Sequence, residues 1–453
     1  MILARLDRLP ATRCVWTMIT LLSLGGIFEF YDLFLTGYIV PGLVKGGLLA
    51  NVGIGIFNGP ALFVAATFTG LFIGTFVFGF VADKYGRRSI FAWSLLWYSV
   101  AAFIMAFQTT GMEVCLWRLI AGIGIGVELV TIDTYIAELT PKHLRGRAFA
   151  FNQVVQFSVV PLVAFISYLL VPTAPIGFDG WRWVVAIGAI GAVVVWFIRQ
   201  GIPESPRWLI NQGRLAEADA VTAGIEAKVS ADLGAALPAP APHAVERPEP
   251  LGSFAEVWRA PYRSRTFMLM VFQFFQTFGF YGFAAWVPTL IARQVGINLG
   301  SSLLYAFIIA VANPFGPLLA LSFADRWERK WQVVGGACGV AIFGVLFSFQ
   351  ATLVLLTVFG VLITLSNNVL SFAFHAYQTE LFPTRIRARA VGVTYSFSRI
   401  STVFASFIIG FFLQQAGTKG VFGTIAFAML MVVLSIGIFG PSTRGLELEQ
   451  ISS

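Results

Sequence analysis

The stretch ELTPKHLRGR (residues 138–147) returns 242 residues later as ELFPTRIRAR (residues 380–389). A second pair of stretches, GFVADKYGRR (79–88) and LSFADRWERK (321–330), is separated by the same 242 residues. Two pairs of motifs with one offset indicate an internal duplication, and two parallel halves are the simplest arrangement. Each motif stands between long apolar stretches, so the charged motifs are expected to be loops that join helices.

The composition indicates a membrane protein. Of the 453 residues 57% are hydrophobic and 11% are charged, whereas a soluble domain has about 25% charged residues. Twelve apolar stretches are each close to the roughly 20 residues that a helix needs to cross a bilayer. They are continuous and rich in Phe and Leu, which favours helices over a transmembrane barrel. The expected helices span approximately residues 15–42, 56–82, 89–108, 112–138, 147–171, 181–200, 266–293, 299–323, 330–350, 351–378, 388–413 and 420–440.

The predicted fold is therefore an all-α membrane protein, with twelve transmembrane helices in two pseudo-symmetric six-helix bundles. The bundles are expected at residues 1–200 and 263–453. The connector between them, residues 201–262, begins with PESPRWL (203–209) and becomes Ala- and Pro-rich, which predicts short surface helices followed by a flexible tether. Most of the 30 Lys and Arg residues fall on the connector side, so both termini are predicted to be cytosolic.

Charge and cysteine content argue against other classes of protein. The net charge of +8 is explained by the inner loops, so no nucleic-acid partner is expected. Cys14, Cys115 and Cys338 match neither a metal spacing nor a disulfide framework. No cofactor, metal or enzyme activity is predicted. The glycines of GIGIG (122–126) and GLFIG (70–74) lie inside expected helices, where small residues allow close packing.

Four motifs, taken in order, resemble those of the major facilitator superfamily. They are GFVADKYGRR, WRLIAGIGIGVEL (117–129), PESPRWL and PSTRGLELEQI (441–451). The resemblance covers nearly the whole chain and narrows to the branch shared by sugar porters and organic-ion proton symporters of the nicotinate and aromatic-acid type. It implies a twelve-helix transporter that works by alternating access, most simply as a monomer in a bacterial inner membrane. The second copy of the first motif departs from the family pattern, with Leu321 and Glu328 in place of glycines.

The resemblance assigns the charged loop residues to a gate. A guanidinium can hold a carboxylate bidentately or cap the carbonyls at the end of a helix, and the family uses such contacts as a cytosolic latch. The alternative is that these charges only set topology. The predicted gate residues are Asp83, Arg87, Arg88, Glu138 and Arg147, with Asp325, Arg329, Glu380 and Arg389 in the second half.

Charged residues inside the membrane are functional candidates, because each costs several kcal/mol unless it is paired or hydrated. From the helical rise, Asp32 and Arg118 lie roughly 14 and 9 Å from the outer ends of their helices, so they can meet. The resemblance to proton-coupled sugar porters implies that Asp32 takes up the proton and releases Arg118; a permanent structural pair is the alternative. Glu29, one turn from Asp32, is either a second proton site or a neutral hydrogen-bond donor.

Arg399 and Glu128 lie at similar depth, so a structural pair between them is one interpretation. The other comes from YSFSRISTVF (395–404), which resembles the site where organic-anion carriers have an arginine. That resemblance implies that Arg399 binds a substrate carboxylate. Asp133 and His375 occupy equivalent positions of the two halves and are predicted to help close the cytosolic end of the cavity, and Glu128 is also predicted to be a gate residue. The alternative for His375 is a packing role.

Uncharged polar residues on cavity helices are further candidates for substrate binding, although such side chains often only join neighbouring helices. They are Asn152, Gln156, Gln273, Gln276, Tyr281, Asn313 and Asn367. The predicted function is proton symport of a small organic acid, an aromatic or heterocyclic monocarboxylate. The alternatives are a proton-coupled sugar or polyol porter, an exporter or uniporter of organic ions, and a receptor that binds without transport.

Overall fold

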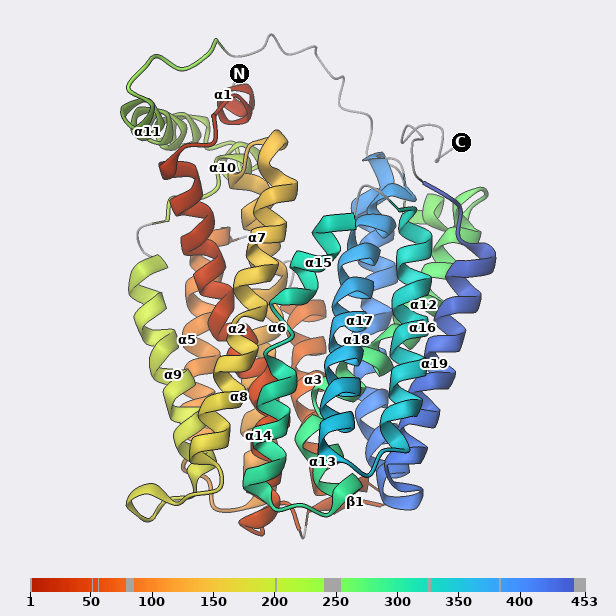
Figure 1. Cartoon of the computed structure of the whole chain (residues 1–453). Helices are drawn as coiled ribbons and strands as arrows, with labels where there is room; N and C mark the ends of the chain where they lie inside the picture. Colours follow the sequence, from red (N-terminus) through yellow and green to blue (C-terminus); the bar gives the residue numbers. More distant parts are fainter. Residues whose placement is uncertain are drawn as a thin grey trace.

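The computed structural model describes residues 2–50, 52–55, 57–78, 85–199, 202–239, 254–323, 327–382 and 384–443. Figure 1 shows two bundles of long helices side by side. We call the end of the molecule that carries α10 (Pro206–Asn211) and α11 (Leu215–Leu233) the connector end. The other end carries a two-stranded hairpin of β1 (Gly53–Ile54) and β2 (Phe57–Asn58), and we call it the hairpin end.

Each bundle contains six long segments in chain order. The first bundle consists of α2 (Arg13–Lys45), α3 (Gly59–Phe78), α5 (Arg87–Met105), α6 (Gly111–Leu139), α7 (Arg145–Phe157) with α8 (Val159–Leu170), and α9 (Gly180–Arg199). The second consists of α12 (Tyr262–Ala284) with α13 (Val287–Val295), α14 (Leu299–Ala310) with α15 (Phe315–Phe323), α16 (Arg329–Ser348), α17 (Leu353–Glu380), α18 (Thr384–Gln415) and α19 (Gly417–Phe439).

The predicted twelve-helix, all-α fold is confirmed. Among the described residues, eleven helical spans are long and apolar enough to cross a membrane. The remaining segment, α9, packs against α2 and α5 and runs through the first bundle with them (Figure 1). The start of α2 and the end of α19 both lie at the connector end, as an even number of crossings requires.

Three of the expected helices are broken near their middle. α7 and α8 meet at Ser158, α12 and α13 meet at residues 285–286, and α14 and α15 are separated by residues 311–314. A proline stands at or just after each break, at Pro161, Pro288 and Pro314. Proline has no amide hydrogen, and its ring clashes with the carbonyl four residues earlier, so the helix opens at that point. The sequence prediction of continuous helices was wrong at these three places.

Glycines let α3 and α6 approach closely. A Cβ atom on Gly70 would overlap the carbonyl oxygen of Leu119, and one on Gly74 would overlap that of Ile123. Gly122 and Gly126 on α6 pack in the same way against the backbone of α3. The interpretation of both glycine motifs as packing surfaces is therefore confirmed.

A short N-terminal helix, α1 (Ile2–Asp7), docks onto α11 at the connector end (Figure 1). Arg5 forms ion pairs with Asp219 and Glu226, and Arg8 donates a 2.5 Å hydrogen bond to Glu226. Burial alone would raise the pKa of the Glu226 carboxyl, but the hydrogen bonds from Arg5 and Arg8 outweigh it, so this pKa lies below its usual range. The tether expected after α11 lies largely at residues 240–253, outside the described residues.

The two bundles meet in the half of the molecule nearer the hairpin end. The rings of Phe57 and Phe407 lie 4.5 Å apart, and those of Phe165 and Phe307 lie 5.2 Å apart. Gly410 on α18 packs against Ala61 on α3. These apolar contacts close the interface toward the hairpin end.

Candidate functional site

A cavity of about 590 Å³ lies between the two bundles. This volume is within the usual range of small-molecule sites. Residues of α2, α6 and α7 line it from the first bundle, and residues of α12, α17 and α18 from the second. Its aromatic wall includes Phe30, Phe34, Phe149, Phe157, Phe280, Phe372 and Phe374, and its polar groups include Asp133, Gln156, Gln276, Tyr281, His375, Tyr395 and Arg399.

Among the described residues of this cavity wall, Arg399 is the arginine. Its side chain is buried, and the residue is 3% exposed. Its guanidinium donates a 3.2 Å hydrogen bond to the hydroxyl of Tyr395 and lies 4.8 Å from the centre of the Tyr395 ring. The Tyr281 hydroxyl lies within electrostatic range of the same guanidinium. A guanidinium with five N–H donors and a hydrogen bond to the Tyr395 phenol keeps donors for an anionic ligand.

Two carboxylates of the first bundle lie within electrostatic range of Arg399. They belong to Asp133 on α6 and Glu29 on α2. Glu128, which the sequence offered as a structural partner of Arg399, is fully buried in α6 and is not among the cavity-lining residues of the described chain. Equal depth had not indicated Asp133 or Glu29 as neighbours of Arg399, and the pairing of Arg399 with Glu128 stays a prediction.

Asp133 and His375 line the same cavity, as their equivalent positions in the repeat had suggested. The His375 ring lies 4.1 Å from the ring of Phe374, and its Nδ1 is 2.6 Å from the carbonyl oxygen of Ser371. Asp133 is exposed to the cavity. A role for the pair in closing the cavity stays a prediction.

Asp32 and Arg118 form a buried ion pair. The Nη1 of Arg118 lies 2.9 Å from Oδ2 of Asp32, and Arg118 is 0% exposed. The other two nitrogens of the guanidinium also donate hydrogen bonds: Nη2 bonds the Asp32 carbonyl at 2.5 Å and the Thr36 hydroxyl at 2.6 Å, and Nε bonds the Thr67 hydroxyl at 3.0 Å. α2, α3 and α6 are therefore joined at one point in the apolar interior.

Glu29 is fully buried one turn before Asp32. It lies within electrostatic range of Arg399 and Tyr281 of the second bundle, whereas Asp32 is bonded to Arg118 on α6. Gly26, on the turn before Glu29, packs against the side-chain amide of Gln156. The face of α2 that carries Glu29 is thus directed toward the cavity.

The predicted amides divide into two groups. Gln156 and Gln276 line the cavity. Gln273 is not among the residues that line the cavity. Its side-chain oxygen accepts a 3.4 Å hydrogen bond from Gln276, and its side-chain nitrogen donates a 2.9 Å hydrogen bond to Gln378. Asn152 is buried on α7 with 1% exposure. Gln273 and Asn152 therefore do not line the described cavity, and their role in substrate binding stays a prediction.

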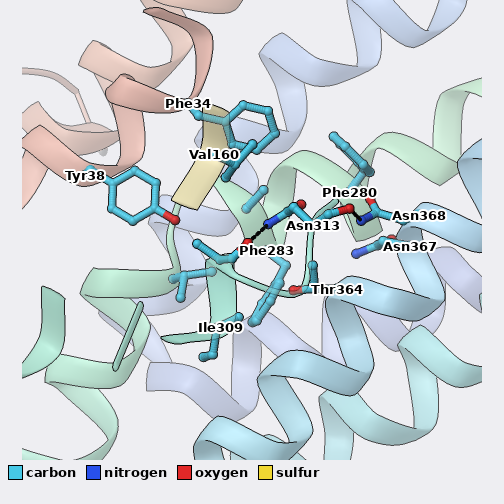
Figure 2. Close-up of a pocket in the computed structure, with 13 residues that line it drawn as sticks. Phe34, Tyr38, Val160, Phe280, Phe283, Ile309, Asn313, Thr364, Asn367 and Asn368 are labelled. Carbon is cyan, nitrogen blue, oxygen red and sulfur yellow. Dashed lines mark hydrogen bonds between the residues drawn. The ribbon is translucent and has the colours of Figure 1, made fainter. Parts of the chain in front are cut away.

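Asn313 and Asn367 lie outside the large cavity. They line a separate pocket of about 30 Å³, shown in Figure 2, which has room for about one water molecule. Asn313 sits in the break between α14 and α15 and bonds the Ala310 carbonyl at 3.0 Å, and Asn367 bonds the Gly279 carbonyl at 3.1 Å. Both amides thus donate to backbone carbonyls of the second bundle. Direct substrate contact by Asn313 and Asn367 stays a prediction.

Comparison with protein families identifies the class of protein to which this chain belongs. The model of the family described as "Sugar (and other) transporter" matches residues 18–453. The chain belongs to this family. It is a multi-pass membrane transporter of the major facilitator superfamily, which agrees with the predicted class and excludes the enzyme classes that the sequence had already disfavoured.

Curated relatives of this transporter match over nearly full length. It is 31% identical to the putative metabolite transport protein YyaJ of Bacillus subtilis, over 98% of this chain and 96% of the relative. It is 28% identical to the niacin transporter NiaP of Acinetobacter baylyi, over 99% of both chains. The inward open structure of the xylose transporter XylE from E. coli aligns with a TM-score of 0.74 and 21% identity, over 96% of this chain and 99% of that one. At that identity the likeness shows the fold alone.

The residues predicted to form the gate make equivalent contacts in the two halves, each within one bundle. In the first half Arg87 pairs with Glu138 at 3.2 Å, and the Tyr135 hydroxyl bonds the Pro203 carbonyl. In the second half Arg329 pairs with Glu380, and the Tyr377 hydroxyl bonds the Pro441 carbonyl at 2.8 Å. The repeat found in the sequence is therefore also a repeat of contacts. Arg147 and Arg389 are exposed, and Asp83 and Asp325 lie outside the described residues.

Two residues with structural contacts near the candidate site or gate were not predicted from the sequence, Glu204 and Tyr395. Glu204, inside the PESPRWL motif, accepts hydrogen bonds from the backbone amides of Arg87 and Arg88 at 3.1 and 3.2 Å and so caps the start of α5. A carboxylate at a helix N-terminus is favourable. Nothing in the sequence, however, indicates that Glu204 contacts the start of α5. Tyr395 could have been found, because it precedes Arg399 by one helical turn.

Proposed function

We propose that this transporter carries a small aromatic or heterocyclic monocarboxylate together with a proton. The observation that supports this most is Arg399, a buried cation in the wall of an aromatic cavity. A planar guanidinium can bind a carboxylate through two parallel hydrogen bonds, and the phenylalanine rings suit a flat ligand. The relative named a niacin transporter has a name that fits this ligand class, because niacin is a heterocyclic monocarboxylate.

Proton coupling is assigned to the Asp32–Arg118 pair. Protonation of Asp32 removes the charge that Oδ2 presents to Arg118 at 2.9 Å, so the ion pair weakens and α2 can move relative to α6. The surrounding hydroxyls of Thr36 and Thr67 then remain as neutral acceptors for the guanidinium. A permanent structural pair is the competing role.

The connector end is assigned to the cytosol, because the inner loops carry most of the basic residues. Both termini then lie in the cytosol, and a bacterial inner membrane and a monomeric protein are the simplest setting. The cavity wall extends to Gly146 near the connector end of α7, while the Phe57–Phe407 and Phe165–Phe307 contacts close the other side. This pattern supports an inward-facing conformation.

The test is ligand binding by the purified protein. Nicotinate and benzoate are expected to raise its thermal unfolding midpoint, and Arg399→Ala should weaken that binding about ten- to a hundredfold, because a hydrogen bond to a charged group contributes about 1.5–3 kcal/mol. Arg399→Lys, which keeps the charge but not the fork, should lie between. Nicotinamide controls for the ring without the carboxylate.

A proton-coupled sugar or polyol porter is the second candidate. It is favoured by Gln156 and Gln276, whose amides face the cavity and can bond hydroxyl groups. Stabilisation by xylose or a polyol in both wild type and Arg399→Ala, with no effect of either carboxylate, would establish this function instead. Uptake into proteoliposomes with an imposed pH gradient then separates a symporter from a uniporter or a receptor.

A further inference from the structure

The imidazole of His375 has a fixed hydrogen-bonding polarity. Its Nδ1 lies 2.6 Å from the carbonyl oxygen of Ser371, one turn earlier on α17. Because a carbonyl oxygen can only accept a hydrogen bond, Nδ1 carries the hydrogen. In the neutral ring Nε2 then has a lone pair and no hydrogen, so it can only accept. Among the described residues Nε2 has no hydrogen-bond partner, which leaves it available to a ligand.

His375 and Arg399 are packed against the same tyrosine. The centre of the Tyr395 ring lies 6.3 Å from the centre of the His375 ring and 4.8 Å from the guanidinium carbon of Arg399. The Tyr395 hydroxyl accepts a 3.2 Å hydrogen bond from Arg399. All three residues line the cavity of about 590 Å³. One small aromatic ligand can therefore contact the guanidinium and Nε2 together.

Other polar groups of the cavity wall adapt to either kind of ligand atom. The hydroxyls of Ser371 and Ser398 can donate or accept. The amides of Gln156 and Gln276 each present a donor and an acceptor. Neutral His375 differs, because Nε2 would bond an O–H or N–H of the ligand but would meet an acceptor atom lone pair to lone pair. Leaving both such groups without a partner in a buried site is unfavourable.

We propose that His375 determines substrate specificity: with the ligand carboxylate on Arg399, Nε2 of His375 accepts a hydrogen bond from a donor on the ligand ring. The substrate is then an aromatic monocarboxylate that carries a hydroxyl or N–H group on its ring. A ring nitrogen that only accepts, as in nicotinate, fits less well. This proposal rests on the proposed function, because Arg399 must first hold the carboxylate.

The test compares ligand affinities of the purified full-length protein at pH 8, where an imidazole with the usual pKa of about 6.5 is neutral. The ligands are benzoate, nicotinate and the three hydroxybenzoates, with the matching methoxybenzoates as controls that keep the oxygen but lack the donor. At least one hydroxybenzoate should bind about two- to tenfold more tightly than benzoate, as one neutral hydrogen bond predicts. It should also bind more tightly than nicotinate and its own methoxy analogue.

His375→Phe keeps an aromatic ring and removes the acceptor. It should bring the affinity ratio of hydroxybenzoate to benzoate close to one and leave benzoate affinity nearly unchanged. Ser371→Ala and Asp133→Asn are the matched controls, because both residues line the same cavity and can accept a hydrogen bond. Both controls should keep the wild-type ratio. Loss of the ratio in either control, with the ratio kept in His375→Phe, would assign the acceptor to that residue and overturn the proposal.

A second measurement does not depend on a His375 variant that folds. The chain has three histidines, so the double variant His143→Gln/His243→Gln, labelled with ¹⁵N-histidine, reports on His375 alone by NMR. Its Nε2 signal should move toward that of a protonated nitrogen when the preferred hydroxybenzoate binds, and much less with the methoxy analogue. An Nε2 signal that responds equally to both, or no preference for any hydroxybenzoate in the wild type, would overturn the proposal and leave the proposed function standing. Absence of binding by every carboxylate would overturn both.

Discussion

Arg118→Met should destabilise the protein far more than Asp32→Asn. The methionine keeps most of the apolar length of the side chain but leaves the Asp32 carboxylate buried without its cation. Removing one partner of a buried ion pair costs about 3–5 kcal/mol, several times the roughly 0.6 kcal/mol of an average hydrogen bond between membrane helices. The variant can escape by protonating Asp32, which costs an ordinary carboxylic acid about 4 kcal/mol at pH 7 and about 1.5 kcal/mol at pH 5.

The reverse change is milder because the guanidinium keeps its acceptors. In Asp32→Asn, the amide oxygen can still accept from Nη1 of Arg118, and the bonds to the Asp32 carbonyl, Thr36 and Thr67 are unaffected. The double variant Asp32→Asn/Arg118→Met carries no buried charge at all. It should therefore be more stable than Arg118→Met alone, a clear departure from additivity.

The assay is the thermal unfolding midpoint of the four proteins in one detergent, at pH 7 and at pH 5. We expect the largest loss for Arg118→Met at pH 7, a smaller loss for the same variant at pH 5, and partial recovery in the double variant at pH 7. If the two single losses simply add, or if Arg118→Met is as stable as wild type at pH 7, the energetic account of this pair is wrong.

Three further predictions concern packing and the connector end. Gly70→Ala should lower the free energy of unfolding by about 1–3 kcal/mol because its methyl group overlaps the backbone of α6, whereas Gly423→Ala, which meets open space, should be neutral or slightly stabilising in the same thermal assay. Glu204→Ala removes the cap of α5, and its expected loss of about 1 kcal/mol should appear as faster hydrogen exchange in the first turn of that helix. Glu226→Gln should speed exchange of α1 by up to about fivefold, since a partly exposed ion pair contributes at most about 1 kcal/mol, while Glu217→Gln should not. The pKa of Glu226 lies below its usual range, so the α1–α11 contact keeps this contribution above about pH 4 and loses it on acidification; exchange of α1 that is insensitive to Glu226→Gln would contradict the assignment.

Hydropathy and the repeat were enough to predict the helices, their pairing into halves and the ends of most of them. They did not predict the helix breaks, which depend on backbone hydrogen bonding and not on side-chain hydropathy. A hydropathy count does not register a missing amide hydrogen, so the breaks before Pro161, Pro288 and Pro314 were read as continuous helix. The prolines were visible in the sequence, and their consequence follows from backbone bonding alone.

The candidate site was predictable to the extent that it lies within one helix pair. Asp32 and Arg118 were paired by depth, because both belong to one bundle and a rise per residue places them. The same calculation paired Arg399 with Glu128, and it gave no indication that Glu29 and Asp133 also lie within electrostatic range of Arg399. Depth fixes one coordinate only; the rotation of each helix and the separation of the two bundles depend on tertiary packing that no local pattern records.

The glycine contact between α3 and α6 determines how a change at Arg118 is transmitted. Where the backbones of α3 and α6 are in direct contact, there are no side chains between them that can repack. The two helices are therefore expected to move together as one rigid unit. Arg118 is on α6, and Thr67, which accepts a hydrogen bond from its Nε, is on α3. Neither residue can therefore move with Asp32 when the ion pair breaks. The helix that moves must then be α2, which also carries Glu29 on its cavity face. Proton uptake at Asp32 would thus be felt at the substrate cavity as a shift of Glu29.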